Sequence, residues 1–347
     1  MSAVKSAIGR FGLGRLRGAN NEGVLVLVLV ALVIIMSALN PAFFTVSTLF
    51  SILRTSIVPL VFALAVLIVI VSGGIDVSFP VIAIFSAYAM VSFSVDGGFD
   101  LGLILSFVVA CLVGALLGLI NGGLIAKFRL PTLIVTLGTQ GIFKGILLAY
   151  IGSRYIADLP SSIGAISTAN VIEIDNETTR AYLHVFIVPV LVLAVVVWLL
   201  LKKTMFGRGV YAIGGDIEAA RRAGFRVERT QVLVYVIAGA IAAFGGMLHV
   251  IMSRNANPQD LLGSELDIIA AVVLGGASIF GGRGSVYGTV LGVLLVQLIN
   301  NSLLLIGVPT AWQRTAVGVL LVVGVGVQAL SAKKASKRVH VNDQLEA

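Results

Sequence analysis

The chain has 347 residues, of which 58% are hydrophobic and only 12% are charged, and its mean hydropathy is +1.07. Polar residues this scarce cannot cover the surface of a soluble domain, so the composition predicts a polytopic membrane protein. The net charge of +8 does not indicate a nucleic-acid partner, because 18 of the 24 Lys and Arg residues fall in segments expected on one side of a bilayer. This asymmetry is typical of a membrane protein whose basic loops face the cytoplasm.

Apolar runs separated by polar segments predict about ten transmembrane helices. A basic, partly amphipathic arm over residues 1–22 precedes them and is expected on the cytoplasmic side. The predicted spans cover residues 23–39, 49–71, 80–94, 101–126, 130–151, 184–201, 231–251, 266–280, 285–306 and 312–330. An even number of spans leaves the basic tail, residues 331–347, in the cytoplasm as well. We therefore expect an all-α membrane protein with one transmembrane domain over residues 23–330.

Two long polar loops are predicted on opposite sides of the membrane. Residues 152–183 carry more acidic than basic side chains, which predicts this loop on the outer face of the membrane. Residues 202–230 carry a concentration of Lys and Arg, which places that loop in the cytoplasm.

Glycines recur at intervals of four in the fourth and ninth predicted spans, where they give each helix a flat face that another backbone can approach closely. The two sets are Gly114, Gly118 and Gly122, and Gly284, Gly288 and Gly292. Because the two spans are five apart and an odd-length repeat inverts orientation, a five-plus-five inverted repeat is possible.

The charged loop 202–230 contains a predicted short helix over residues 217–223. Asp216 can cap its first turn, because a carboxylate accepts hydrogen bonds from the free N–H groups there, and Gly224 can adopt the left-handed conformation that ends a helix. Two turns alone are unstable in water, since isolated helices below about 12 residues rarely form. The helix is therefore expected to dock into a groove of a partner, and the alternative is an ordinary solvated connector.

Both faces of this predicted helix fit the docking interpretation. Glu218 precedes Arg221 and Arg222 by three and four residues, a spacing that stabilises a helix from its exposed side. Ile217, Ala220 and Ala223 recur at intervals of three and form a smooth face of mostly small side chains.

Polar side chains recur along one face of the fifth predicted span, at Thr132, Thr136, Gln140 and Lys144. An interval of four places them in a line on the helix. Polar groups that face lipid are costly, so this face should point into the bundle, either as a wall of a solute pathway or as hydrogen bonds between helices.

Two further sets of polar residues are candidates for the same pathway. Gln297, Asn300 and Asn301 in the ninth span carry donors and acceptors that match sugar hydroxyls, although amide hydrogen bonds between helices are an equally ordinary use. Asp76 and Ser78 follow a glycine pair and either contact a solute at a broken helix or cap the third span.

Several kinds of chemistry are not indicated. The chain has no GxxxxGK[ST] sequence for binding phosphates, and its three His and single Cys do not have the spacing of metal ligands. Few acidic residues lie deep in the predicted spans, which disfavours coupling to a proton or sodium gradient.

Motifs spread over nearly the whole chain resemble one family, the permease subunits of ribose-type ABC sugar importers, which are related to branched-chain amino acid permeases. The matching segments are residues 73–78, 121–122, 130–139, 207–208, 211–215, 219–221 (Ala219-Ala220-Arg221), 263–267, 270–276, 280–285 and 312–313. In that family the Ala-Ala-Arg segment resembles the element that contacts the ATPase, so the resemblance implies that Asp216, Ile217, Glu218, Ala219, Ala220, Arg221 and Gly224 form the ATPase-coupling segment.

The resemblance implies a transport permease of the bacterial inner membrane that is not itself an enzyme and carries no metal or cofactor. ATP and Mg²⁺ are expected in a separate ABC ATPase subunit. The other expected partners are a periplasmic sugar-binding protein, a second permease (an identical copy or a close paralogue) and a monosaccharide substrate (pentose, hexose or polyol). The alternatives are a gradient-driven secondary carrier or channel, which would transport without an ATPase, and a purely structural membrane scaffold.

Overall fold

A computed structural model describes residues 22–40, 43–176 and 179–309 and isolated positions between 312 and 322. Apart from Glu22, the predicted basic arm lies outside the described residues, as do most of the predicted span 312–330 and all of the tail 331–347.

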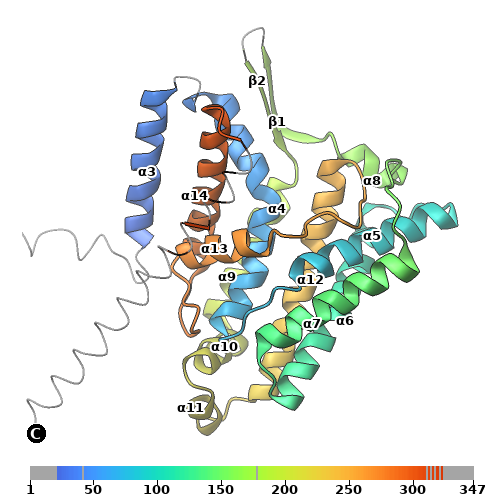
Figure 1. Cartoon of the computed structure of the whole chain (residues 1–347), viewed down its shortest axis with the longest axis vertical. Helices are drawn as coiled ribbons and strands as arrows, with labels where there is room; N and C mark the ends of the chain where they lie inside the picture. The colour runs from blue at the N-terminus through green and yellow to red at the C-terminus, as the bar shows by residue number, and fades with distance from the viewer. Residues whose placement is uncertain are drawn as a thin grey trace, which may run out of the picture.

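The described part of the chain is mainly helical and contains one small hairpin (Figure 1). In chain order the elements are α3 (Glu22–Leu39), α4 (Val46–Val71), α5 (Phe79–Gly97), α6 (Leu103–Phe128), α7 (Thr132–Ile146), the π-helical turn η2 (Leu147–Ile151), α8 (Ser161–Ile166), β1 (Asn170–Asn176), β2 (Thr179–His184), α9 (Ile187–Lys203), α10 (Met205–Gly215), α11 (Ile217–Arg222), α12 (Val227–Ser253), α13 (Glu265–Leu274) and α14 (Val286–Leu305).

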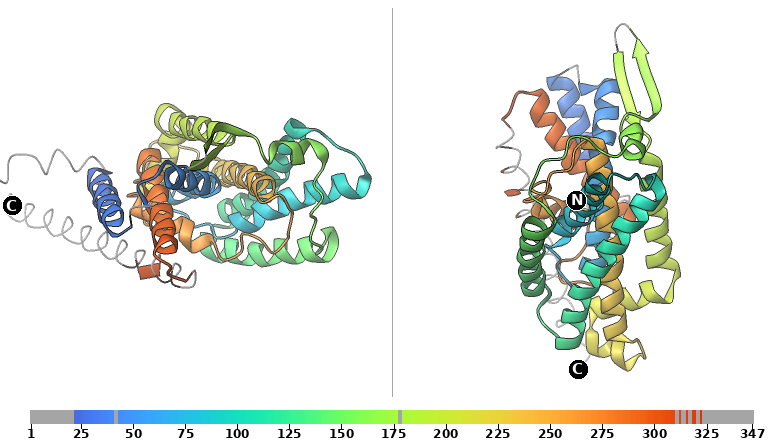
Figure 2. Two further views of the ribbon diagram at one scale, coloured as in Figure 1. Left: turned by 90° about the horizontal axis from the view of Figure 1, so that it is seen from above. Right: turned by 90° about the vertical axis from the view of Figure 1, so that its right-hand side faces the viewer.

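Helix α4 lies at the centre of the bundle. Its second half, from Leu60 to Val71, is buried at every position. This stretch is apolar on all sides, a pattern found both in protein cores and in membrane spans. Its burial shows that neighbouring helices enclose it. Helices α12, α14, α9 and α13 pack against it. Viewed from above, α3 lies at one end of the elongated bundle and the α5–α6 turn at the other (Figure 2).

The helices confirm an all-α polytopic protein but do not confirm ten spans. Among the described residues, six helices are long and apolar enough to cross a membrane, or seven if α9 and α10, which meet at an angle of 71°, count as one span. The predicted span 266–280 is wrong in length, because α13 has only 10 residues. A helix of that length rises about 15 Å, half of the hydrocarbon thickness.

Both long loops contain structure that the sequence did not indicate. The predicted loop 152–183 contains α8 and most of the antiparallel β1–β2 hairpin, with Asn170 opposite His184 and Asp175 opposite Arg180. The predicted loop 202–230 contains α10 before the expected short helix. These features lie at opposite ends of the molecule, with the hairpin at one end and α11 at the other (Figures 1 and 2).

Glycines allow α6 and α12 to pack in backbone contact, as their spacing predicted. A Cβ atom on Gly118 would lie 2.1 Å from the carbonyl oxygen of Tyr235, and one on Gly114 would lie 2.4 Å from the carbonyl oxygen of Gly239. In α14, a Cβ on Gly292 would lie 2.0 Å from the carbonyl oxygen of Ala271 in α13. The inverted repeat suggested by these two stripes stays a prediction.

We expect Gly118→Ala to destabilise the protein by about 1–3 kcal/mol, the usual cost of overpacking a tight interior. Gly123→Ala is the matched control, because it lies in the same helix and its added Cβ would meet no atom within 4 Å. Denaturation of the purified protein in detergent measures both effects. Equal stability of the two variants would contradict backbone contact between α6 and α12.

Candidate functional site

The short helix α11 forms an exposed projection at one end of the molecule. It spans Ile217–Arg222, and Asp216 caps it as predicted, since its Oδ1 accepts a hydrogen bond of 2.9 Å from the backbone N–H of Ala219. Glu218 pairs with Arg221 at 2.6 Å on the exposed side. Gly224, one residue after the C-cap, has the predicted left-handed conformation with a φ of 87°.

One face of α11 packs against its own chain. Ala220 is buried in a small cluster with Ile213 of α10 and Val227 of α12, so it does not belong to the surface that a partner could reach. Ile217 on the neighbouring face is 43% exposed. Asp216, Glu218, Ala219, Arg221 and Gly224 are exposed as well. Of the predicted small-residue face, Ala220 therefore packs inside the protein, whereas Ile217 lies on the surface.

Helix α10 carries α11 and was missed because glycine is a poor helix former and α10 is rich in it. Two signals for it were present in the sequence. Thr204 caps the helix by accepting a hydrogen bond of 3.0 Å from Gly207. Phe206, Val210 and Ile213 have helical spacing, and the last two are buried.

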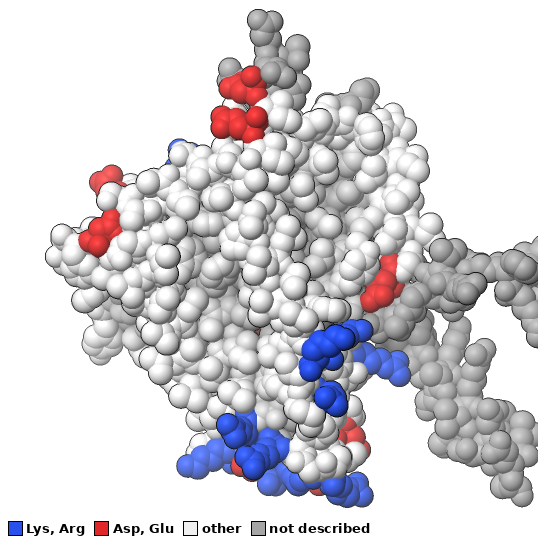
Figure 3. All heavy atoms as spheres, turned by 180° about the vertical axis from the view of Figure 1, so that it is seen from behind, with Lys and Arg blue, Asp and Glu red and all other residues white. Residues whose placement is uncertain are grey.

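Basic side chains gather around this end of the molecule, whereas acidic side chains lie at the hairpin (Figure 3). The basic residues that segment 202–230 contributes are Lys202, Lys203, Arg208, Arg221, Arg222, Arg226 and Arg229. At the hairpin, β1 carries Glu173 and Asp175. The two loops therefore lie at opposite ends of the molecule, and the side of the membrane that each one faces stays a prediction.

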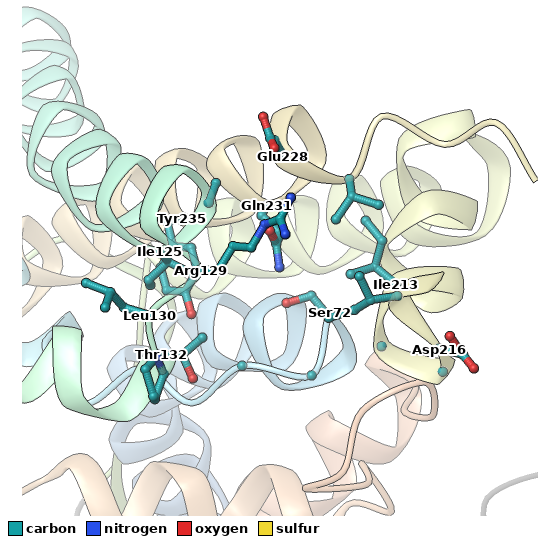
Figure 4. A pocket seen from close by; sticks show the side chains of 18 of the residues that line it. Ser72, Ile125, Arg129, Leu130, Thr132, Ile213, Asp216, Glu228, Gln231 and Tyr235 are labelled. Carbon is teal, nitrogen blue, oxygen red and sulfur yellow. The ribbon is translucent and has the colours of Figure 1, made fainter. Parts of the chain in front are cut away.

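A hollow of about 880 Å³ opens beside α11. Arg129, at the end of α6, and Gln231 and Tyr235 of α12 project into it (Figure 4). Thr132 and Ser72 line it where α7 begins and α4 ends. Among the candidate pathway residues only Thr132 lines this hollow; the sequence reading did not single out Arg129, Gln231 or Tyr235.

The polar face of α7 points into the protein and mainly satisfies backbone and side-chain groups there. The hydroxyl of Thr132 accepts a hydrogen bond from the N–H of Ile75 at 3.0 Å, and that of Thr136 donates to the carbonyl of the same residue at 3.3 Å. Gln140 donates to Glu265 of α13 at 2.8 Å. Lys144, one turn further, is half-buried.

Asp76 caps a bend in the chain rather than lining a hollow. It is 3% exposed, and its Oδ1 accepts from the backbone N–H of Ser78 at 2.7 Å and from the Ser78 hydroxyl at 2.6 Å. Asn121 of α6 donates to the same hydroxyl at 2.9 Å. This geometry holds the turn that leads into α5, whose N-cap residue Ser78 makes no side-chain capping hydrogen bond. Contact of Asp76 and Ser78 with a solute stays a prediction.

The amides of α14 lie elsewhere, near the first half of α4. Asn301 donates to the hydroxyl of Thr55 at 3.4 Å and accepts from that of Ser51 at the same distance. The Oδ1 of Asn300 is buried without a hydrogen-bond partner, and Gln297 is half-buried. Thus the two predicted polar faces of α7 and α14 do not meet in one site.

A second hollow of about 510 Å³ lies toward the hairpin end of α4. Its walls include Ser51, Arg54 and Thr55 of α4, His249 of α12 and Ser264 before α13. Asp260 lies 3.2 Å from the Nε2 of His249. These are hydroxyl, guanidinium and imidazole groups, which bind neutral polar solutes through hydrogen bonds.

We expect Asp76→Ala to lower the stability of the protein by about 1–3 kcal/mol, because a buried backbone N–H loses its acceptor. Asp76→Asn retains a carbonyl oxygen at the same place and should preserve most of the stability. Thermal unfolding in detergent distinguishes the two variants. An unchanged unfolding midpoint for Asp76→Ala would show that the carboxylate does not support the start of α5.

Comparison with known proteins gives a consistent result. Residues 48–325 match the family described as branched-chain amino acid transport system / permease component. The chain is 33% identical over 333 residues to the ribose import permease of Haemophilus influenzae, covering 93% of this chain and 96% of that protein. It is 37% identical over 297 residues to the ribose import permease of Bacillus subtilis, covering 85% and 88%.

A further relative is the autoinducer 2 import system permease of Yersinia enterocolitica, which is 32% identical over 302 residues and covers 87% of this chain and 81% of its own length. No solved structure matches the chain significantly. The matched length, the multi-pass helical structure and the motifs agree, and the chain belongs to the family of ABC importer permeases that includes the ribose import permeases.

Proposed function

We propose that this protein is the permease subunit of an ATP-driven importer of the bacterial inner membrane and that it carries a monosaccharide. A periplasmic binding protein delivers the sugar, a second permease copy completes the pathway, and ABC ATPase subunits that bind ATP and Mg²⁺ dock on α11 in the cytoplasm. The observation that carries this proposal is the exposed, capped helix α11 at the basic end of the molecule.

The structure of α11 supports docking more than a connecting role. A helix of six residues has little stability of its own, yet here it is capped at Asp216 and anchored by buried Ala220. The anchoring leaves Ile217 beside the Glu218–Arg221 pair on the outer surface. An exposed apolar side chain with polar groups around it fits the apolar core and polar rim of protein interfaces.

The polar groups of the interior support a neutral substrate. The smaller hollow offers the hydroxyls of Ser51, Thr55 and Ser264, and its volume lies within the range of about 300–1,000 Å³ found for small-molecule pockets. The relatives import ribose or autoinducer 2 by their names. A pentose, hexose or related polyol is therefore the substrate class that we assign. Weak binding by the permease would suffice, because a tightly held sugar could not leave.

We expect Arg221→Glu and Glu218→Lys to leave membrane insertion intact and to reduce sugar uptake at least about tenfold, because each reverses a charge at a contact worth about 1.4 kcal/mol or more. Lys203→Glu is the matched control, since it is an exposed charge reversal at the end of α9. Uptake and ATP hydrolysis are measured with the assembled complex in proteoliposomes.

Equal uptake by all three variants would contradict docking at α11. Uptake by the purified permease alone, driven by a proton or sodium gradient without an ATPase, would support the alternative of a secondary carrier instead.

The proposed orientation has its own test. In a Cys111→Ser background, a cysteine introduced by Glu173→Cys in the hairpin should react with a membrane-impermeant maleimide in intact spheroplasts. A cysteine introduced by Glu218→Cys in α11 should react only after the membrane is opened. Both positions are exposed. A lack of labelling would therefore mean that the membrane keeps the reagent away from the cysteine, not that the side chain is buried in the protein. Labelling of Glu218→Cys in intact spheroplasts would exclude a cytoplasmic ATPase from α11.

A further inference from the structure

Three backbone segments meet where α4, α10 and the α13–α14 loop end. A Cβ atom on Gly214 of α10 would lie 1.9 Å from the carbonyl oxygen of Val71 and 2.6 Å from the backbone nitrogen of Gly282. A Cβ atom on Gly281 would lie 2.8 Å from the Cα of Gly73. We name Gly73, Gly214, Gly281 and Gly282 the glycine junction. No side chain separates the three segments there.

Hydrogen bonds join the same segments. The N–H of Gly282 donates to the carbonyl of Val71 at 2.9 Å, which satisfies one of the carbonyls that the last turn of α4 leaves free. The hydroxyl of Tyr211 in α10 donates to the carbonyl of Gly284 at 2.8 Å. The α13–α14 loop is therefore bonded to both α4 and α10.

The junction lies between the exposed helix and the interior. Gly214 is separated from Asp216, the N-cap of α11, by one residue. On the other side, Gly73 begins the non-helical segment 73–78. This segment is held to α7 by the hydrogen bond from Ile75 to Thr132 and contains Asp76, which accepts a hydrogen bond from Ser78. Backbone contacts thus run without interruption from α11 to the wall of the larger hollow.

We propose that the glycine junction transmits displacement of α11 to segment 73–78 and to the end of α4. This inference rests on the proposed function, in which a partner moves α11. Side chains at an interface can absorb a small displacement by changing rotamer, whereas backbones in direct contact have no such freedom. A shift of α10 is therefore passed to α4 as a rigid movement, and closely packed interfaces of this kind move between discrete states.

A purely structural role predicts a different outcome from the same substitutions. A junction that only stabilises the fold would, when disturbed, reduce the amount of folded permease and lower uptake and ATP hydrolysis together. A junction that transmits movement would, when disturbed, leave hydrolysis in place and lower the number of sugar molecules carried per ATP.

The test compares Gly214→Ala with Gly215→Ala in the complete importer, with the sugar-loaded binding protein present in proteoliposomes. The two glycines are adjacent, but a Cβ atom on Gly215 would meet no atom within 4 Å. We expect Gly214→Ala to lower sugar uptake per ATP hydrolysed by about fivefold or more, the lower end of coupling between distant sites. Gly215→Ala should keep the wild-type ratio.

Tyr211→Phe is a second variant that tests the same role if Gly214→Ala does not insert into the membrane. It removes one hydroxyl and its bond to Gly284 while keeping the ring, and it should lower the same ratio by about twofold to fivefold, consistent with the loss of a hydrogen bond worth about 0.5–1 kcal/mol. A wild-type ratio in every variant that inserts overturns the junction's role.

Failure of the two proposals can be told apart. A wild-type complex without ATP-driven uptake overturns the proposed function, and the junction's role with it. If the wild-type complex and the Gly214→Ala and Tyr211→Phe variants all carry the same amount of sugar per ATP hydrolysed, the proposed function stands. That result overturns only the role of the glycine junction.

Discussion

The enclosure of the second half of α4 is the constraint on which the rest of the structure depends. Every residue from Leu60 to Val71 is buried. Because lipid is as apolar as these side chains, the hydrophobic effect does not hold them inside the bundle. Close packing does so instead, and it requires neighbours that come near. The glycine contacts between α6 and α12 and between α13 and α14 give these surrounding pairs the close fit that such a centre needs. The position of α4 then fixes where its two ends emerge, and both hollows lie at those ends.

The non-helical segment after α4 explains the use of several polar residues. Inside a membrane protein each backbone N–H and C=O needs a partner. In segment 73–78 only Gly73, Gly74 and the carbonyl of Ser78 bond to the flanking helices α4 and α5. Thr132, Thr136 and Asp76 supply partners to other N–H groups of the segment. Residues that suggested a solute pathway therefore first maintain the break between α4 and α5. A broken chain at this depth is tolerated where it is enclosed by protein or borders a cavity, and this segment does both, since Gly73 and Gly74 also line the larger hollow.

Sequence reasoning was most accurate where a local rule determines the structure. The Asp216 cap, the left-handed Gly224 and the close-packed faces of α6 and α14 all follow from side-chain chemistry or from the lack of a side chain at one position. It was least accurate where a tertiary contact decides. Helix α10 forms against its propensity because buried Val210 and Ile213 hold it. The end of α13 at Leu274 is different, because it follows from a local signal that the predicted span did not use: Gly275 and Gly276 come next, and Gly276 has a φ of 92°. The partners of Thr132 and Asn301 are 57 and 246 residues away in the sequence, a separation that no periodic pattern can indicate.

The positions of the two hollows limit how a solute could cross. On α4 the smaller hollow extends to Phe62 and the larger one begins at Ser72, and Ala63–Val71 between them is buried throughout. A route inside one protomer therefore requires this part of α4 to separate from α12 or α5. A route along a surface shared with the proposed second copy would leave this packed centre intact. The end of α4, segment 73–78 and the α13–α14 loop, which meet α10 at the glycine junction, lie at the edge of that centre.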